Sequence, residues 1–179
     1  KLETHAFAAS ISGAIASYHH NLIAHCTDRN WSLAGGFNQG GQFAGQVDIR
    51  NNVVYNWQGR TTDGGVKQCN FVNNYYLQGA NTGGPLALYI RNKSGKTYFS
   101  GNWMDDKLVA DQKSLVLAST AAPGEHVVDQ PFPFGPVATQ SADVAYRLVL
   151  DKAGASKARD PIDARIAACS PLDVTRSRF

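Results

Sequence analysis

A short pattern of polar, apolar and polar residues recurs along the first hundred residues, and it constrains the fold more than any other feature of the chain. Each copy ends on a polar position, occupied by His25, Asn56, Asn74 and Asn102, and these positions lie 31, 18 and 28 residues apart. Repeats of this length are typical of a solenoid. A single strand of this kind cannot bury its apolar face alone, so stacked copies share one continuous core.

The recurring asparagine indicates how the copies are joined. Asparagine at one point of each rung, meaning one turn of the solenoid, lets each side-chain amide donate to the next. The alternative is a β-sandwich with asparagine in ordinary turns, and the recurring positions favour it less. Seventeen glycines also fit a turn-rich β fold. The sequence therefore predicts an all-β fold, a right-handed parallel β-helix.

Composition limits the classes of partner. The chain has 179 residues, 43% of them apolar, and its longest apolar run is far shorter than the ~20 residues of a transmembrane helix. The net charge of +3 includes no basic run, so nucleic acid and membranes are not the expected partners. An acidic polymer held by a few local cations is compatible with this balance.

The chain divides into two parts by pattern. Residues 1–110 carry the rungs, interrupted by a glycine-rich excursion from Ala34 to Gly45. Residues 111–179 are expected to pack along the solenoid or cap its end, with a helix from Ser141 to Lys152 that has Val144, Leu148 and Val149 on one side. Because the rungs begin at about residue 6 without a capping segment or a signal peptide, we expect the C-terminal portion of a longer solenoid.

Three cysteines, Cys26, Cys69 and Cys169, allow at most one internal disulfide. Each lies in or beside an apolar stretch, and free cysteine is commonly a small buried residue. No pair has the spacing of a cysteine-type zinc site.

Several longer stretches resemble one known family. They are residues 17–25 (SYHHNLIAH) with 28–30 (DRN), residues 48–57 (DIRNNVVYNW) and residues 70–76 (NFVNNYY). In this order they resemble the signature strands of the pectate lyase superfamily, polysaccharide lyase family 1. Residues 153–166 are similar to the C-terminal segment of bacterial members. The resemblance covers residues 5–82 densely and 147–166 more loosely.

The resemblance implies a chemistry as well as a fold. Members are parallel β-helix enzymes that are secreted or periplasmic, use calcium, and cleave pectate-type uronate polymers by β-elimination. Their base is an arginine that follows the His-His-Asn strand, and that position is Arg29 here. Guanidinium normally keeps its proton, so the alternative is that Arg29 only pairs with a carboxylate. We predict that Arg29 projects outward beside the strand of residues 47–56, with the loop Gly35–Gly45 as one wall and Trp31 near its base.

The motif also departs from the family. Its proline is replaced by Trp31 and its second, substrate-binding arginine by Ala34. Arg50 or Arg60 would have to supply that cation from the neighbouring rung, and Trp31 either stacks on a sugar ring or fills core volume. The family's substrate-binding lysine falls near His5.

Histidines complete the candidate set. His19 and His20 are adjacent and should point to opposite sides of a strand, which places one of them, taken as His20, toward the groove. We expect His25 to be structural, because it occupies a ladder position. A zinc site of His19, His25 and a carboxylate has no accepted ligand spacing to support it.

The calcium ligands of the family lie on rungs that precede the His-His-Asn strand. The aspartates present here, Asp28, Asp48 and Asp63, match none of those positions. The resemblance therefore implies calcium as a cofactor whose usual ligands are not in this chain. The implied partner, besides pectate, is the missing N-terminal half of the same solenoid. We expect these 179 residues to be inactive alone.

Two rival functions differ in class. A β-helix glycoside hydrolase would need clustered carboxylates, and Asp105-Asp106 is the only acidic pair. A carbohydrate-binding solenoid without catalysis would explain Ala34 as a lost arginine. Replacing Arg29 discriminates the lyase from the binding protein, because only the lyase would lose an elimination activity.

Overall fold

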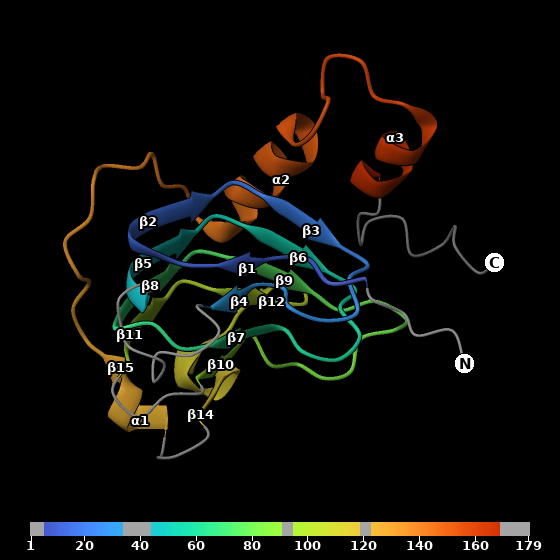
Figure 1. Cartoon of the computed structure of the whole chain (residues 1–179). Coiled ribbons are helices and arrows are strands. Elements are labelled where there is room, and N and C mark those ends of the chain that lie inside the picture. Colours follow the sequence, from blue (N-terminus) through green and yellow to red (C-terminus); the bar gives the residue numbers. More distant parts are fainter. Residues whose placement is uncertain (1–5, 34–43, 91–94, 119–122, 169–179) are drawn as a thin grey trace.

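The computed structural model describes residues 6–33, 44–90, 95–118 and 123–168. Three sheets of five strands each wind around one core (Figure 1). Sheet 1 contains β1 (Ser10–Ile11), β4 (Ser32–Leu33), β7 (Thr62–Gly64), β10 (Leu88–Ile90) and β14 (Val116–Ala118). Sheet 2 contains β2 (Gly13–His19), β5 (Ala44–Arg50), β8 (Gln68–Val72), β11 (Lys96–Ser100) and β15 (Val127–Val128). Sheet 3 contains β3 (Leu22–Ala24), β6 (Val53–Tyr55), β9 (Tyr75–Leu77), β12 (Trp103–Met104) and β13 (Lys107–Leu108).

The pairing confirms the parallel solenoid. Successive rungs pair in parallel in all three sheets, and the one antiparallel pair among the described strands is the hairpin of β12 and β13. Within β5, Val47 and Ile49 are fully buried and point into the core. Ile49 lies in register with Phe71, which pairs with Phe99, and these two rings stack 4.9 Å apart. Alternation along each strand thus fills one interior with a column of apolar side chains.

The asparagine ladder exists, but its register differs from the predicted one. It consists of Asn21, Asn52, Asn74 and Asn102, spaced 31, 22 and 28 residues apart, each just before a strand of sheet 3. The backbone and side-chain N–H groups of each residue donate to the side-chain oxygen of the next at 2.8 to 3.1 Å. The oxygen of Gln112 continues the ladder by accepting from Asn102.

His25 and Asn56 belong to a second position, which follows β3 and β6. There Asn56 Nδ2 donates to His25 Nδ1 over 2.8 Å. The predicted ladder therefore joined two different corners of the rung. Both corners carry polar residues with positive φ, such as Asn51 at 54° and Asn56 at 52°, and this similarity explains the error.

The corner before the ladder requires special residues. His20, Asn51 and Asn73 have φ between 52° and 55°, and Gly101 has φ 69°. Asparagine tolerates this left-handed conformation better than most residues. At Gly101 a side chain is also excluded, because an added Cβ would lie 1.8 Å from Asn73 Oδ1.

The C-terminal part continues the solenoid and then covers it. Residues 111–179 were expected to pack along the solenoid or cap its end, and within them β14 adds a strand to sheet 1 and β15 a strand to sheet 2. A short helical turn precedes each of these strands: η1 (Gln112–Leu115) before β14 and α1 (Pro123–His126) before β15. Gln140 then spans the corner, exchanging two hydrogen bonds with Asn51 and accepting another from Asn73.

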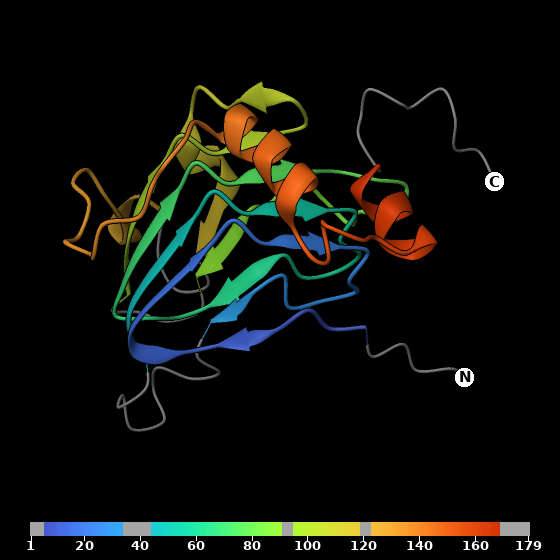
Figure 2. The same cartoon turned by 90° about the horizontal axis from the view of Figure 1, so that it is seen from above.

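The predicted helix is confirmed as α2 (Ala142–Lys152). Figures 1 and 2 show α2 and the following α3 (Pro161–Ala167) on one side of the solenoid, next to sheet 3. Of the predicted face of α2, Val149 is buried, whereas Val144 is 43% exposed. Ala142, Ala145 and Tyr146 complete the buried face, which packs with Val53, Tyr75 and Leu77. In the described part of the chain, every helix is too short or too polar to span a bilayer.

We predict that Asn74→Ala lowers the free energy of unfolding by about 2–4 kcal/mol, because buried partners above and below lose their hydrogen bonds. Urea unfolding measures the change. Asn81→Ala is the matched control, because Asn81 is exposed and only its backbone N–H has a recorded bond. A loss below about 0.5 kcal/mol for Asn74→Ala would contradict a stabilising ladder.

A second prediction concerns His25 and acid. Burial first, and the charge of Arg165 second, lower the pKa of His25 below its ordinary value. As the pH falls, the unfolded chain therefore takes up this proton before the folded chain does. The contribution of His25 to the free energy of unfolding is fully present above the ordinary histidine pKa of ~6.5 and decreases below it. His25→Asn, which keeps a residue suited to φ 60°, should lose less stability than the wild type between about pH 8 and about pH 5. Equal losses in urea unfolding would refute this.

Candidate functional site

The outward face of sheet 1 brings together the charged residues that the sequence analysis singled out. Ser10 pairs with Ser32, and Ser32 pairs with Asp63, so these three side chains form one outward row. Arg29 and Arg60 each precede the paired residues Ser32 and Asp63 by three positions. The two arginines are therefore in register on neighbouring rungs, whose strands are ~4.8 Å apart.

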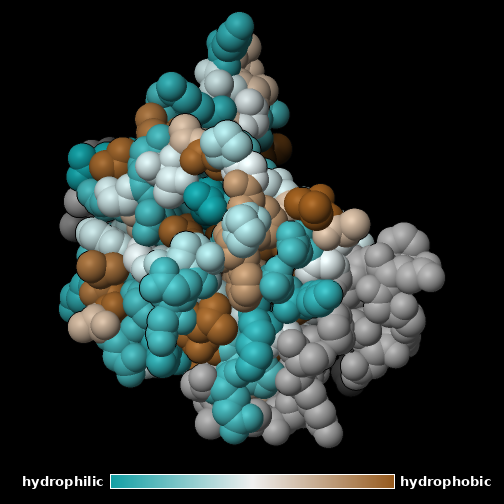
Figure 3. Space-filling view, turned by 90° about the vertical axis from the view of Figure 1, so that its left-hand side faces the viewer, coloured by the Kyte–Doolittle hydropathy of each residue, from teal (hydrophilic) through white to brown (hydrophobic). Residues whose placement is uncertain are grey.

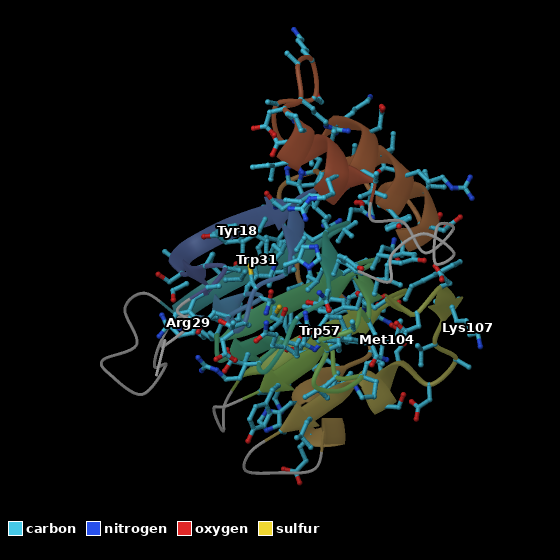
Figure 4. The ribbon with its side chains drawn as sticks, turned by 90° about the vertical axis from the view of Figure 1, so that its right-hand side faces the viewer. Tyr18, Arg29, Trp31, Trp57, Met104 and Lys107 are labelled. Carbon is cyan, nitrogen blue, oxygen red and sulfur yellow. The ribbon has the colours of Figure 1, made fainter. Side chains whose placement is uncertain are left out.

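Arg29 lies in the turn between β3 and β4, with a φ of 59°. Its guanidinium carbon is 4.6 Å from the centre of the Phe7 ring, and Nη1 lies 3.4 Å from Ser10 Oγ. Figure 4 shows it at the edge of the strands, away from α2 and α3. Among the residues that the structure describes, no carboxylate forms an ion pair with Arg29. Its charge is instead held by an aromatic face and a hydroxyl.

Arg60 has a different environment. Its Nη1 donates to Asp63 Oδ2 over 3.1 Å, and its Nε lies 3.4 Å from Asp28 Oδ1. The backbone N–H of Arg60 also donates to Asp28 Oδ1. The Asp63 side chain is 2% exposed, whereas that of Arg60 is 39% exposed. Two carboxylates thus fix the direction of the guanidinium while part of it faces solvent.

Trp31 is a core residue. It is 7% exposed, and its ring centre lies 5.7 Å from that of Tyr18. Both residues are labelled in Figure 4. Of the two roles considered for this side chain, filling core volume is the one that its position permits. A sugar ring on the outer face of sheet 1 would not reach it.

Arg50 and His20 lie away from Arg29. Arg50 is on sheet 2, where it binds the fully buried Asp48 through two nitrogens at 2.5 and 2.6 Å and donates to Thr139. His20 directly follows β2 with φ 55°, contacts His19 and bonds to Gln140 over 2.7 Å. The expected alternation of the two histidines therefore does not apply. Both His20 and Arg50 hold the tail residues 139–140.

The surface on the sheet 2 side is mixed in character. Figure 3 shows small hydrophobic groups interspersed with hydrophilic residues on the side where β2, β5 and β8 lie in Figure 1. Arg29 was predicted beside the strand of residues 47–56, but its recorded contacts are with Phe7 and Ser10, next to sheet 1. His5 and the loop of residues 34–43, including Ala34 and the predicted wall, lie outside the described residues.

Both aspartates of the acidic pair that a hydrolase would use form hydrogen bonds within the fold. Asp105 accepts from the backbone N–H and the side chain of Gln78, and Asp106 accepts from the Tyr75 hydroxyl. Burial and this hydrogen bond raise the pKa of Tyr75 above its ordinary value. Both aspartates lie at the end of sheet 3, so they do not face the arginine pair.

The calcium that the resemblance implies was tested against the oxygen ligands present. Calcium takes six to eight oxygens, mostly from carboxylates and carbonyls. Within residues 6–33, 44–90, 95–118 and 123–168, no three His, Cys, Asp or Glu residues come together as a metal site. The two carboxylates near Arg29, Asp28 and Asp63, both bind Arg60. The described residues therefore do not fit a calcium site, and no zinc site forms from His19 and His25.

Sequence reasoning did not assign Asp28, Asp63 or Ser10 to the site. The signal that could have found them is the offset of 31 residues between Arg29 and Arg60, which equals the ladder spacing between Asn21 and Asn52. Cys69 is buried and Cys26 partly buried, both with free thiols, whereas Cys169 lies outside the described residues. Neither described cysteine lies on the arginine face.

The comparisons with known proteins agree with the fold. The chain is 29% identical over 133 residues to a probable pectate lyase C of Aspergillus flavus and to one of Aspergillus oryzae, and 30% identical to one of Neosartorya fischeri. The match covers 69% of this chain but only 31% of each relative. No family model matches the chain. The chain is thus a distant homologue of the fungal proteins named pectate lyase C, built on a parallel β-solenoid.

Proposed function

We propose that this chain carries the base and part of the polymer-binding face of a polysaccharide lyase that acts on 4-linked uronate polymers of the pectate type. The observation that supports it best is the position of Arg29. This guanidinium lies on the outward side of sheet 1 beside Ser10, and no described carboxylate pairs with it. An anionic sugar would supply the missing negative charge. Secretion or export to the periplasm belongs to the same proposal.

The proposed step is a β-elimination. A base takes the proton from C5 of the uronate, next to the carboxylate, and the C5–H electrons form the C4–C5 double bond. The C4–O bond breaks, and the departing sugar oxygen gains a proton. Negative charge develops on the carboxylate during this step, so fixed cations beside it lower the barrier.

Arg29 is the proposed base, and Arg60 is the neighbouring fixed cation. A guanidinium keeps its proton over the ordinary pH range. We therefore expect elimination to accelerate toward alkaline pH, where a larger fraction of the base is neutral. Calcium enters no step here, because the described residues do not fit it.

A binding protein without catalysis is the second candidate. The replacement of the family's second arginine by Ala34 favours it. The two candidates share the face of sheet 1 and differ only in whether a C5 proton is removed. A hydrolase is not proposed, because Asp105 and Asp106 are bound to Gln78 and Tyr75.

We predict that Arg29→Lys lowers the elimination rate on polygalacturonate by ~100-fold or more, because lysine does not reproduce the position of the guanidinium. The rate is the absorbance of the unsaturated product, measured in a protein that contains these residues together with preceding rungs. Arg147→Lys is the matched control, since Arg147 is exposed on α2. The control should retain the wild-type rate.

The same assay separates the candidates. Residues 1–179 alone are predicted to bind polygalacturonate and to release no unsaturated product. Clear turnover by this chain would contradict the predicted inactivity. Polymer binding without elimination in the longer protein as well would favour the binding protein, and an unchanged rate in Arg29→Lys would remove Arg29 as the base.

A further inference from the structure

We propose that Arg60 binds the uronate carboxylate directly, and that this chain recognises the polymer without a divalent cation. This inference rests on the proposed function and identifies the side chain that binds the carboxylate of the substrate. The resemblance implies calcium, but the carboxylates present among the described residues do not form a calcium site. The two carboxylates described on this face, Asp28 and Asp63, both pair with Arg60.

The position of Arg60 suits this role. Ser32 pairs with Asp63, and Asn30 Nδ2 donates to the carbonyl oxygen of Arg60, so the rung of Arg60 lies directly beside that of Arg29. Neighbouring rungs are ~4.8 Å apart. A carboxylate held at Arg60 therefore lies next to the proposed base.

The guanidinium of Arg60 is fixed but not saturated. It has five N–H donors, and its recorded contacts are Nη1 with Asp63 and Nε with Asp28. The side chain is 39% exposed, so a ligand can approach it while donors outside these two contacts remain. Because two aspartates fix its direction, Arg60 can offer parallel N–H groups to a carboxylate at little further entropic cost.

The local charges set the expected strength. Arg29 and Arg60 carry two positive charges, and Asp28 and Asp63 carry two negative ones. The Asp63 side chain is 2% exposed, so solvent and ligand meet chiefly the two guanidinium groups and the partly exposed Asp28. Recognition therefore depends on directed hydrogen bonds more than on net charge, which favours free carboxylates over methyl esters.

Calorimetric titration of the chain with tetragalacturonate tests the proposal, in EDTA and in calcium chloride. We expect equal affinities in the two buffers and no shift of Tm on adding calcium. The fully methyl-esterified oligomer should bind at least ~10-fold more weakly, because a bidentate charged hydrogen bond is lost. Loss of binding in EDTA, or a rise in Tm with calcium, would overturn the proposal.

Two substitutions of Arg60 complete the test. Arg60→Gln should weaken binding by ~10- to 100-fold, and Arg60→Lys, which keeps the charge that Asp63 needs but not the fork, should also lose affinity. Arg147→Gln should bind as the wild type does, and Tm shows whether each variant is folded. Wild-type affinity in both Arg60→Lys and Arg60→Gln would refute the role of Arg60 in binding, without refuting the proposed function. Absence of any binding by the wild type would instead refute the proposed function.

Discussion

The hydrogen bonds between asparagine side chains at one corner of the solenoid fix the register on which the remaining structure depends. From Asn52 onward each asparagine of the ladder is buried, and its amide oxygen accepts two N–H groups from the rung before it. A buried amide without partners is costly, so a rung that slips by one residue would lose its bonds on both sides. The ladder therefore aligns the rungs at this corner, in addition to the buried hydrogen bonds that Thr62 makes with Asn30 and Tyr76.

This alignment carries over to the outer face of sheet 1. The chain from Asn21 to Arg29 and the chain from Asn52 to Arg60 have the same length, so a common start at the ladder places the arginines side by side. The intervening corner has a bond of its own, between Asn56 and His25. The neighbouring arginines are thus positioned by two structural contacts, one before and one after the strands β3 and β6 of sheet 3.

The fold class could be predicted from the sequence because repeated apolar triplets and recurring asparagine both follow from stacking. The register could not, because His25 and Asn56 look like ladder residues and have the same backbone conformation as His20 and Asn51. The buried face of α2 was predicted only in part, with Val149 correct and Val144 exposed, for another reason. Val144 and Leu148 are more apolar than Ala142 and Ala145, but the close approach to Tyr75 and Val53 selects the small residues.

The candidate site was predictable in part. Arg29 and Arg60 were named from a motif and from its missing second arginine, whereas Arg50 and His20 were named on the same grounds and lie on sheet 2 beside the tail. What separates these residues is which of three faces each occupies, and a pattern of period two along one strand contains no information about that. The same limit applies to Trp31. Its sequence position is equally compatible with stacking on a sugar ring and with filling core volume, and only its contact with the ring of Tyr18 distinguishes the two.

The arrangement also explains why a solenoid suits a long acidic polymer. Each rung repeats the backbone at a fixed spacing, so a side chain at one position recurs along the axis as a row. On sheet 1 that row consists of Ser10, Ser32 and Asp63. Arg29 and Arg60 lie beside it, in the turns that precede Ser32 and Asp63. Substituting one side chain in such a row alters recognition at one point and leaves the ladder untouched. Specificity can therefore diverge among relatives of this fold while the core is retained, which is consistent with a chain that shares under a third of its residues with the fungal proteins over the matched region.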